Sequence, residues 1–427
     1  MSQFLLGGHD NGSFTFAPDQ SESPEPEFRG ILARIGEEDG FLLYGTQVLD
    51  QRAIVAIEGK DYMTNWASWL DCQNGVDFNH QDVFRPRRRF LNTPRDIAPY
   101  VHYDALYQAY LVACLRMLGD GAFANDRGMP ESDSRTRSAF ASFGGPHVLA
   151  LLPEVSSRAL KAVWRQKWLH HRRTRPEVVA AWLTLHENEP DRITDTTLAD
   201  ALTQLRAKIP QPILDLIATH NTAQNTETTI TPKADLPDDF PDISDAKNFL
   251  LPQTFPEGSP THPAYGAGHA TVAGACVTVL KAFFEMYEAD GTTERLWPRQ
   301  TFVSTWKRGG VGGTNREGGE LIPAQDDASL TIQHELDKLA MNIANARNMA
   351  GVHYYTDYFE SIRLGERVAT SILEEQLSMY GEPVSMSFTS FDGDRITVCS
   401  NGGASEVLVS TDGTRVSAQA WYDRYSS

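Results

Sequence analysis

The sequence predicts a mainly helical fold that ends in a small β-hairpin. From Thr93 onward, apolar residues recur every three to four positions over long stretches, which is the period of an amphipathic helix. Near the end of the chain, apolar and polar residues alternate on both sides of an Asp-Gly pair, a pattern typical of a β-hairpin. The beginning shows neither period and is rich in glycine and proline. We therefore expect three regions, at 1–92, 93–380 and 381–427.

Residues 1–92 are expected to form an extended arm with a few short strands or turns. The apolar runs at 41–44 and 53–57 have the length of short strands. The basic run at 85–89 is short and contains a proline, and the chain as a whole is acidic. We interpret this run as an ion-pairing surface or a subunit contact.

Residues 93–380 are expected to be helical and to contain the functional site. A polar, proline-bearing linker is expected at 220–246. A Gly-rich stretch at 308–319 lacks the Gly-Lys-Ser/Thr ending of a phosphate-binding loop, so we expect a surface loop there. The terminal hairpin should pair 384–388 with 395–399 and lie at the periphery. The apolar period predicts helices at 104–118, 148–168, 177–185, 197–218, 268–288, 328–349 and 355–377.

Composition is that of an ordinary globular protein, with 41% hydrophobic and 22% charged residues in 427. The formal net charge of −18 argues against nucleic acid or an anionic membrane as a partner. No apolar run approaches the roughly 20 residues of a membrane span. The first residues lack the charged and then apolar segments of a signal peptide, so the cytoplasm is the default expectation for the compartment.

The four cysteines lie far apart without a CxxC pair, so no zinc site is expected. Cys114 and Cys276 lie in apolar helical patterns and are expected to pack as small hydrophobic residues. A disulfide that involves Cys72 or Cys399 is left open.

A histidine loop at 259–271 is the first candidate for a functional site. Its sequence, Ser-Pro-Thr-His-Pro-Ala-Tyr-Gly-Ala-Gly-His-Ala-Thr, carries His262 and His269 ahead of an apolar helical segment. A helix that begins at Gly268 would direct its unpaired N–H groups and the positive end of its dipole at an anion above the loop. His269, in the first turn, could donate or accept a proton there.

Candidate cations for the same anion lie on either side of this loop in the sequence. Lys167 and Arg175, eight residues apart, fall within one broad helix face. Pro176 disfavours the helical conformation at Arg175, which we therefore expect at a helix break with its side chain reaching inward. Each residue alone would suit a solvated helix face.

A third segment contributes one more cation and a histidine. Arg347 closes one helical stretch, Gly351 breaks it, and His353 opens the next, with Asp357 one turn on. Taken together and in this order, three cations, a helix N-terminus and several histidines suit a phosphate-like oxyanion such as phosphate or vanadate.

These segments together resemble the vanadium-dependent haloperoxidases, which share a site and a helical core with acid phosphatases. The pattern of that superfamily is Lys…Arg-Pro, then Ser-Gly-His, then Arg followed by His with Asp four residues further on. The additional His262 and the Lys–Arg spacing of eight are similar to the algal and cyanobacterial bromoperoxidases. The resemblance runs from about Thr93 to the mid-380s and beyond. Further stretches similar to the red-algal type are 93–96, 100–106, 143–147 and 351–358.

The resemblance implies an enzyme that uses hydrogen peroxide to oxidise bromide, and iodide, to a hypohalous-acid equivalent that halogenates small organic acceptors. It implies one vanadate(V) per subunit and a homo-oligomer, a dimer or larger. It also implies a haloperoxidase and acid-phosphatase-like helical-bundle core with the site between its helices.

The resemblance also assigns a role to each residue of the site. His353 is expected to bind vanadium through a ring nitrogen. His269 and Lys167 are expected to be catalytic, His269 by moving protons and Lys167 by activating the peroxide, with His262 as a third catalytic candidate. The oxygens of vanadate are expected to be held by Lys167, Arg175, Arg347 and the Gly268 backbone N–H.

Two positions need separate weighing. Ala267 replaces the serine of Ser-Gly-His; one neutral hydrogen bond contributes only about 0.5–1.5 kcal/mol, so the remaining contacts should suffice. The alternative is a weaker affinity for vanadate or an altered halide preference. Trp164 lies about one turn before Lys167 and, with His262, is expected to line a halide pocket, although a place in the core would also fit.

The sequence leaves two alternative functions open. The first is a phosphatase that uses the same pocket, with His269 and His353 as acid–base and nucleophile. The second is a non-catalytic oxyanion-binding or assembly protein, for which Ala267 is the motive. The pairing of His262 with His269 and the long algal-type stretches favour the haloperoxidase.

Overall fold

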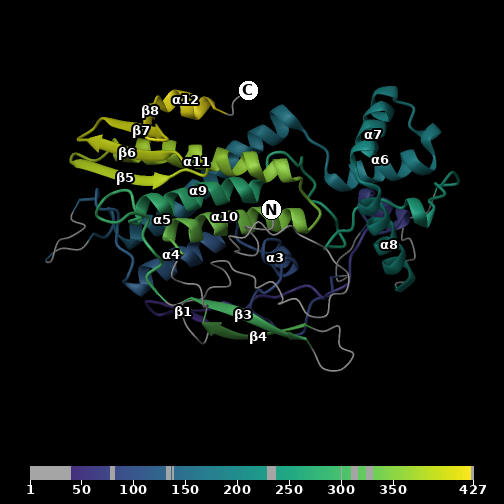
Figure 1. Cartoon of the computed structure of the whole chain (residues 1–427), viewed down its shortest axis with the longest axis horizontal. Helices are drawn as coiled ribbons and strands as arrows, with labels where there is room; N and C mark the ends of the chain where they lie inside the picture. The colour runs from purple at the N-terminus through teal and green to yellow at the C-terminus, as the bar shows by residue number, and fades with distance from the viewer. Residues whose placement is uncertain are drawn as a thin grey trace.

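The computed structural model describes residues 40–76, 82–130, 136, 139–227, 237–299, 301–308, 316–323 and 330–424. A central helix, α9 (Gly268–Phe283), is surrounded by the long helices α5 (Gly145–Arg165), α10 (Ile332–Met349) and α11 (Tyr355–Leu377), as Figure 1 shows. Every residue of α9 from Ala270 to Phe283 is buried, which is typical of a helix that forms the middle of a core. The predicted helical class is confirmed.

Helices α9 and α11 pack with their backbones in close approach. A Cβ atom at Gly274 of α9 would collide with the backbone of Ile362, and one at Gly365 of α11 would collide with the backbone of Thr271. Glycine at both positions therefore permits this contact, which a larger residue would prevent. As a result, α11 is held in a fixed position along α9.

Most of the predicted helices are present. The range 355–377 is α11 itself, while α10 and α9 begin or end a few residues from their predicted limits. Helix α4 (Gln108–Asp120) and helix α6 (Pro176–Asn188) occupy the predicted ranges 104–118 and 177–185. A further helix, α3 (Pro94–Tyr100), begins with a capping box between Thr93 and Asp96.

The prediction of one helix at 197–218 followed by a linker from 220 was wrong. Two helices, α7 (Thr196–Lys208) and α8 (Gln211–Glu227), meet at Pro210. Proline disfavours a helical residue before it, and Ile209 is accordingly extended, with φ −90° and ψ 119°. Residues 228–236 of the predicted linker lie outside the described residues.

A small second core lies beside the main bundle. Helices α6, α7 and α8 gather away from α9 in Figure 1, and helix α2 (Trp66–Gln73), which the sequence analysis missed, lies near α8. The Thr64 hydroxyl, just before α2, donates to Asn225 of α8 over 2.8 Å. The apolar side chains of this second core are Leu183, Leu202, Leu214, Ala218 and Phe249.

The described N-terminal residues begin with a short hairpin. Strand β1 (Phe41–Tyr44) coincides with the first predicted strand and pairs with β2 (Gln47–Asp50). The second predicted strand, at 53–57, forms only isolated bridges, at Ala53 and Ala56. Residues 1–39 of the predicted arm lie outside the described residues of the chain.

The structure confirms the ion pairs expected of the basic run at 85–89 and corrects the loop expected at 308–319. The basic run forms ion pairs, as expected: Arg85 pairs with Glu58 over 3.0 Å and Arg89 with Asp96 over 2.6 Å. The expected surface loop at 308–319 is partly strand, because β3 (Phe302–Arg308) and β4 (Arg316–Pro323) form an antiparallel pair. Residues 309–315 are outside the described residues.

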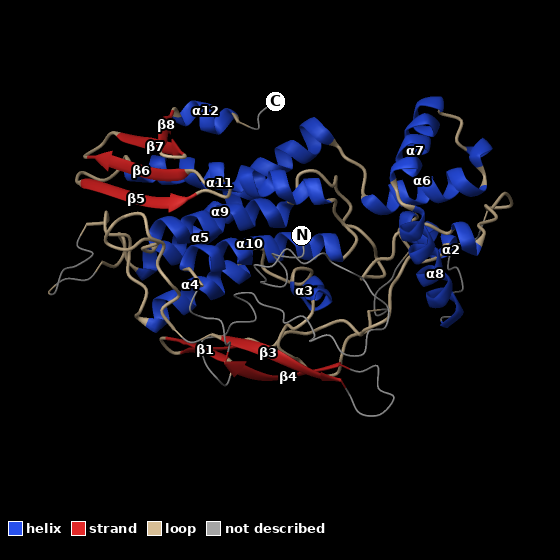
Figure 2. Ribbon diagram, in the orientation of Figure 1, coloured by secondary structure: helices blue, strands red, loops and turns tan. Residues whose placement is uncertain are grey.

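The predicted C-terminal hairpin is confirmed and is longer than expected. Strands β5 (Pro383–Thr389) and β6 (Arg395–Asn401) pair antiparallel across a turn in which Gly393 has φ +88°. The sheet continues with β7 (Ser405–Thr411) and β8 (Thr414–Val416), followed by helix α12 (Ala418–Asp423), as Figure 2 shows.

The sheet is not peripheral, which corrects the expectation for this hairpin. Met386, Phe388, Ile396 and Val398 belong to the same apolar cluster as the residues of α9. Alternation along the strands places these side chains on the inner face, against the helices. The division of the chain at residues 92 and 380 stays a prediction.

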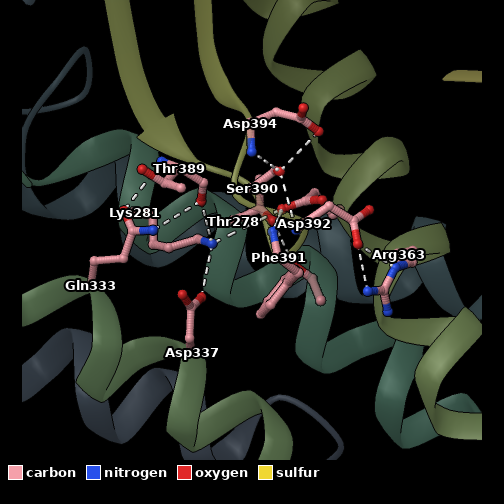
Figure 3. A network of polar contacts seen from close by, with 12 residues as sticks. Thr278, Lys281, Gln333, Asp337, Arg363, Thr389, Ser390, Phe391, Asp392 and Asp394 are labelled. Carbon is pink, nitrogen blue, oxygen red and sulfur yellow. Dashed lines mark hydrogen bonds and ion pairs between the residues drawn. The ribbon is translucent and has the colours of Figure 1, made fainter. Parts of the chain in front are cut away.

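A buried lysine joins α9 to this sheet (Figure 3). The Lys281 side chain is 0% exposed, and its Nζ donates to Asp337 Oδ1 of α10 over 2.8 Å and to the Thr389 carbonyl of β5 over 2.7 Å. Glu366 of α11 lies 4.0 Å away. The ammonium group therefore links three helices and a strand through polar contacts.

Two sequence expectations about the whole chain can also be compared. Cys114 and Cys276 are buried, as predicted, and all four cysteines are free thiols, so neither Cys72 nor Cys399 forms a disulfide. Among the described residues, no helix has the length and apolar character needed to cross a membrane.

Candidate functional site

The histidine loop ends at Ala267, the residue that precedes the first turn of α9. Ala267 is in the extended region and provides no side-chain cap. The first N–H groups of an uncapped helix lack partners within the helix, so they remain for an anion. The Ala264 N–H donates to the Arg173 carbonyl over 2.9 Å, and the Ala267 N–H donates to the Ser361 hydroxyl over 2.8 Å.

Lys167 lies on a widened helical turn that follows α5. This π-helical turn, Gln166–His171, ends at Arg172, which has the left-handed φ of 45°. Lys167 is 1% exposed, and its Nζ donates to the carbonyls of Pro263 and Ala264 over 2.7 and 3.3 Å. The ammonium group thus lies against the histidine loop.

Arg175 lies at the helix break that the sequence predicts. It is extended, with ψ 153°, and Pro176 begins α6 directly after it. Its guanidinium donates to the His262 and Val352 carbonyls over 2.8 and 2.7 Å. Its two terminal nitrogens also lie 3.0 Å from His262 Nδ1 and 3.0 Å from His353 Nε2. One buried arginine therefore contacts two of the predicted histidines.

His353 is held in one orientation by its neighbours. An arginine guanidinium can only donate, so Nε2 of His353 accepts from Arg175 and the ring hydrogen is on Nδ1. Nδ1 lies 2.9 Å from Asp357 Oδ2, which accepts that hydrogen. Asp357 in turn accepts from the Tyr354 N–H over 3.0 Å and pairs with Arg173 over 2.9 Å.

Arg347 and His269 approach the site from the side of residues 101–104. Arg347 is buried in the last turn of α10; one terminal nitrogen donates to the Val101 carbonyl over 3.4 Å, and its Nε has no partner among the described residues. His269 Nε2 lies 3.1 Å from Asp104 Oδ1. The segment around Val101 thus connects the arginine with the loop histidine.

The electrostatics of this cluster are those of an excess of buried positive charge. Burial, followed by the charge of Arg175, lowers the pKa of Lys167 to about 7. Burial lowers the pKa of Arg175 and of Arg347 to about 10. These shifts have the sign expected when positively charged groups are removed from water.

The same environment keeps two of the histidines neutral. Burial, followed by the charges of Lys167 and Arg175, lowers the pKa of His262 to about 4. Burial and Arg175 lower the pKa of His353 well below its usual value. For His269, burial lowers the pKa while Asp104 opposes the shift. A neutral His353 with Nε2 as acceptor has the lone pair that a metal ligand needs.

The structure therefore brings together Lys167, Arg175, His262 and His353, with Arg347 and His269 joined through the segment at 101–104. Trp164 is 49% exposed on α5, which excludes the core alternative; its place in a halide pocket stays a prediction. Ala267 is buried, and its methyl group packs in an apolar cluster with Ala344, Tyr358 and Ile362.

Sequence reasoning missed several residues that hold these groups in place. Asp104 lies 165 residues from His269, and no local pattern joins the two. Ser361 and Arg173 also have no signal of their own. Asp357 had one, because it lies four residues after His353, which is the spacing of neighbours on one helix face.

Known proteins resemble this chain over the region that contains several of these residues. A family model, the second helical-bundle domain of VCPO, matches residues 244–382, which include the histidine loop, Arg347 and His353. The vanadium-dependent bromoperoxidase of Corallina pilulifera is 38% identical over 403 residues, covering 93% of this chain and 60% of that protein. That of Corallina officinalis is 39% identical over 366 residues, covering 85% and 55%.

A solved structure gives the same result for the fold. The homohexameric second vanadate-dependent bromoperoxidase from Ascophyllum nodosum superposes with a TM-score of 0.65 at 26% identity. The match covers 86% of this chain and 59% of that one. The present chain thus spans 55–60% of the length of these three proteins.

Proposed function

We propose that the chain is a vanadate-dependent bromoperoxidase of the vanadium-dependent haloperoxidase family, which its 38–39% identity to two such enzymes over 85–93% of its own length supports. It oxidises bromide, and iodide, with hydrogen peroxide to a hypohalous-acid equivalent that halogenates small organic acceptors. One observation carries the proposal. Lys167, Arg175 and Arg347 are buried around His353, and within the described residues they donate to backbone carbonyls or histidine nitrogens, with no carboxylate in hydrogen-bond contact.

The residues fit vanadate, one per chain. Arg347 Nε is a buried donor with no partner among the described residues, and the first N–H groups of α9 are uncapped. Three cations and these donors match the oxygens of a tetrahedral oxyanion. His353 offers the neutral nitrogen through which the proposal places the bond to vanadium. When bound, vanadate supplies a Lewis-acidic centre that activates hydrogen peroxide toward halide without a change in its own oxidation state.

The protein's own groups then divide the remaining work. Asp357 fixes the hydrogen of His353 on Nδ1 and so keeps Nε2 unprotonated; its lone pair, which accepts from Arg175, is the one that would bind vanadium. Lys167, Arg175 and Arg347 balance the negative charge of the bound oxygens. His269 holds or moves a proton at Nε2, where Asp104 stabilises the protonated ring. His262, with a pKa of about 4, is neutral near pH 7 and acts there as an acceptor for Arg175.

We also propose that the chain forms a homo-oligomer, because the solved relative is a homohexamer. Hydrogen peroxide, a halide and a small organic acceptor are the substrates that the proposal requires.

The test is bromination of monochlorodimedone by the purified protein. After removal of bound anions, activity should require added vanadate, bromide and hydrogen peroxide together. Lys161→Met, which removes an exposed lysine of α5, should behave as wild type, while Arg175→Met should lose most of the activity. Wild-type protein without any vanadate-dependent bromination would overturn the proposal.

The same protein tests the phosphatase alternative, because a phosphate group would also suit the three buried cations. Hydrolysis of p-nitrophenyl phosphate without vanadate, and its inhibition by vanadate, would favour the phosphatase. Binding of phosphate or vanadate without any turnover would favour the non-catalytic alternative.

A further inference from the structure

We propose that Ser361 is a positioning residue that holds the histidine loop at the start of α9 in register with His353. The inference rests on the proposed function, because the register matters for an anion held between these two elements. Ser361 lies on α11, is 2% exposed, and accepts the Ala267 N–H hydrogen bond over 2.8 Å.

One face of α11 makes three successive attachments. Asp357, Ser361 and Gly365 are spaced by four residues and therefore lie on one helix face. Asp357 orients His353, Ser361 binds the end of the histidine loop, and Gly365 lies against the backbone of α9 at Thr271. A single rigid helix thus holds both the ring that is proposed to bind vanadium and the loop that carries His269.

The backbone of the histidine loop lies close to Ser361 at Gly266 as well as at Ala267. A Cβ atom at Gly266 would lie only 2.6 Å from the Ser361 Oγ, so the loop backbone packs directly against the hydroxyl. The carbonyl of Ala267 is fixed as well, because it accepts from the Thr271 N–H over 3.0 Å and from the Thr271 hydroxyl over 2.9 Å. Ser361 therefore makes the hydrogen bond that connects Ala267 to a helix outside the histidine loop and α9.

The identity of residue 267 makes this attachment important. The side chain of Ala267 has no hydroxyl and packs in an apolar cluster, so it makes no polar contact to an anion or to the N–H groups of its own helix. Without the Ser361 hydroxyl, the buried Ala267 N–H would lose its partner. The end of the histidine loop at Ala267 would then lose one of its attachments, while Ala264 stays bound to Arg173 and α11 still holds His353 through Asp357.

The test compares two buried hydroxyls of the same helix. Ser361→Ala removes the contact to the loop. Thr370→Val is the matched control, because Thr370 is equally buried and its hydroxyl donates only to the Glu366 carbonyl of its own helix, over 2.8 Å. Calorimetric titration with orthovanadate should show about three- to tenfold weaker binding for Ser361→Ala, as for the loss of one hydrogen bond. Thr370→Val should bind as wild type.

A second measurement needs no bound anion. Amide hydrogen exchange, followed by mass spectrometry on peptides that cover 259–271, should be faster in Ser361→Ala than in wild type or Thr370→Val. Equal exchange and equal vanadate affinity in the two variants would overturn the positioning role. If wild-type protein bound no vanadate, the proposed function would fail. Faster exchange in Ser361→Ala alone would still support the attachment of the loop to Ser361. Equal exchange in Ser361→Ala and wild type would then refute that attachment.

Discussion

Two buried lysines lie near the opposite ends of α9 and have opposite surroundings. Lys281, in the last turn of α9, contacts Asp337 and the Thr389 carbonyl (Figure 3). Glu366 lies 4.0 Å from the Lys281 Nζ. Lys167 lies against the loop that leads into α9, and its charged neighbours include two arginines, Arg175 and Arg347. Both side chains are almost completely buried, so burial alone does not distinguish them.

The difference lies in the balance of charge. At Lys281, carboxylates and a carbonyl compensate the ammonium group, and the result is a structural link among α9, α10, α11 and β5. At Lys167, carbonyls accept its hydrogens, no carboxylate lies in hydrogen-bond contact within the described residues, and the charge of Arg175 acts on it more strongly than that of Asp357. A buried charge without a counterion costs folding free energy, so it persists where a ligand supplies the missing charge. Lys281 is therefore a structural lysine, whereas Lys167 has the surroundings that we propose for an anion-binding lysine.

The largest expected effect is on stability, at Lys281. Lys281→Met leaves Asp337 and Glu366 without their cation, and removal of one partner from a buried ion pair typically costs about 3–5 kcal/mol. Urea denaturation should show a fall of this size in the free energy of unfolding. Lys161→Met is the exposed control and should change it by no more than about 0.5 kcal/mol. Equal losses in the two variants would contradict the account of Lys281.

The opposite result is expected at Lys167. Lys167→Met removes a buried charge beside Arg175 and Arg347, so the anion-free protein should be as stable as wild type in urea, or more stable. Loss of a charge-assisted hydrogen bond of about 1.5–3 kcal/mol should weaken vanadate binding roughly 10- to 150-fold. A large loss of stability with unchanged binding would make Lys167 a structural lysine like Lys281.

A smaller effect is expected from the residue that orients His353. Asp357→Asn keeps the size of the side chain but removes the carboxylate that accepts from Nδ1. Loss of such a partner typically reduces metal affinity about 10- to 100-fold, and calorimetry with vanadate measures it. Asp392→Asn, which alters an ion pair with Arg363, is the control and should bind vanadate normally. Unchanged affinity in Asp357→Asn would show that the tautomer does not matter.

The pH acts on the stability of the anion-free protein with opposite sign in the two regions. Burial raises the pKa of Glu366, beside Lys281, Asp337 and Asp392, from 4.5 to about 7. The native state then binds more protons than the unfolded state between these values, so this contribution to stability is lost as pH rises through about 7. The pKa of Lys167 is lowered from 10.5 to about 7, so its contribution increases from pH 7 toward 10.5.

These windows can be separated with two variants. In wild type, the free energy of unfolding should contain a contribution that falls from pH 4.5 to 7 and another that rises from pH 7 to 10.5. Glu366→Gln should lack the fall, and Lys167→Met should lack the rise. The same pH profile in a variant and in wild type would show that the group in question does not titrate as inferred.

Local patterns in the sequence predicted much of the site and of the bundle. Arg175 before Pro176 and His353 after Gly351 follow from backbone preferences that act within a few residues, and the structure has both as expected. Strong apolar periodicity likewise predicted α11 over its full length. These features depend on neighbours in the chain, which a single sequence displays.

Features that depend on distant residues could not be predicted in this way. Asp104 meets His269 only after the chain has folded, and the partners of Lys281 come from α10, α11 and β5. The strands β3 and β4 pair across a Gly-rich stretch that has no strand pattern of its own. Ser361 likewise acquires its meaning from a contact 94 residues away in the sequence.

The most direct test of the central claim is a calorimetric titration of orthovanadate into anion-free wild-type protein and into His353→Ala. The account predicts saturable binding of one vanadate per chain by wild type and loss of that binding in His353→Ala, with both proteins folded by urea denaturation. Equal binding by the two proteins, or no saturable binding by wild type, would contradict the assignment of the buried cations and His353 to a vanadate site.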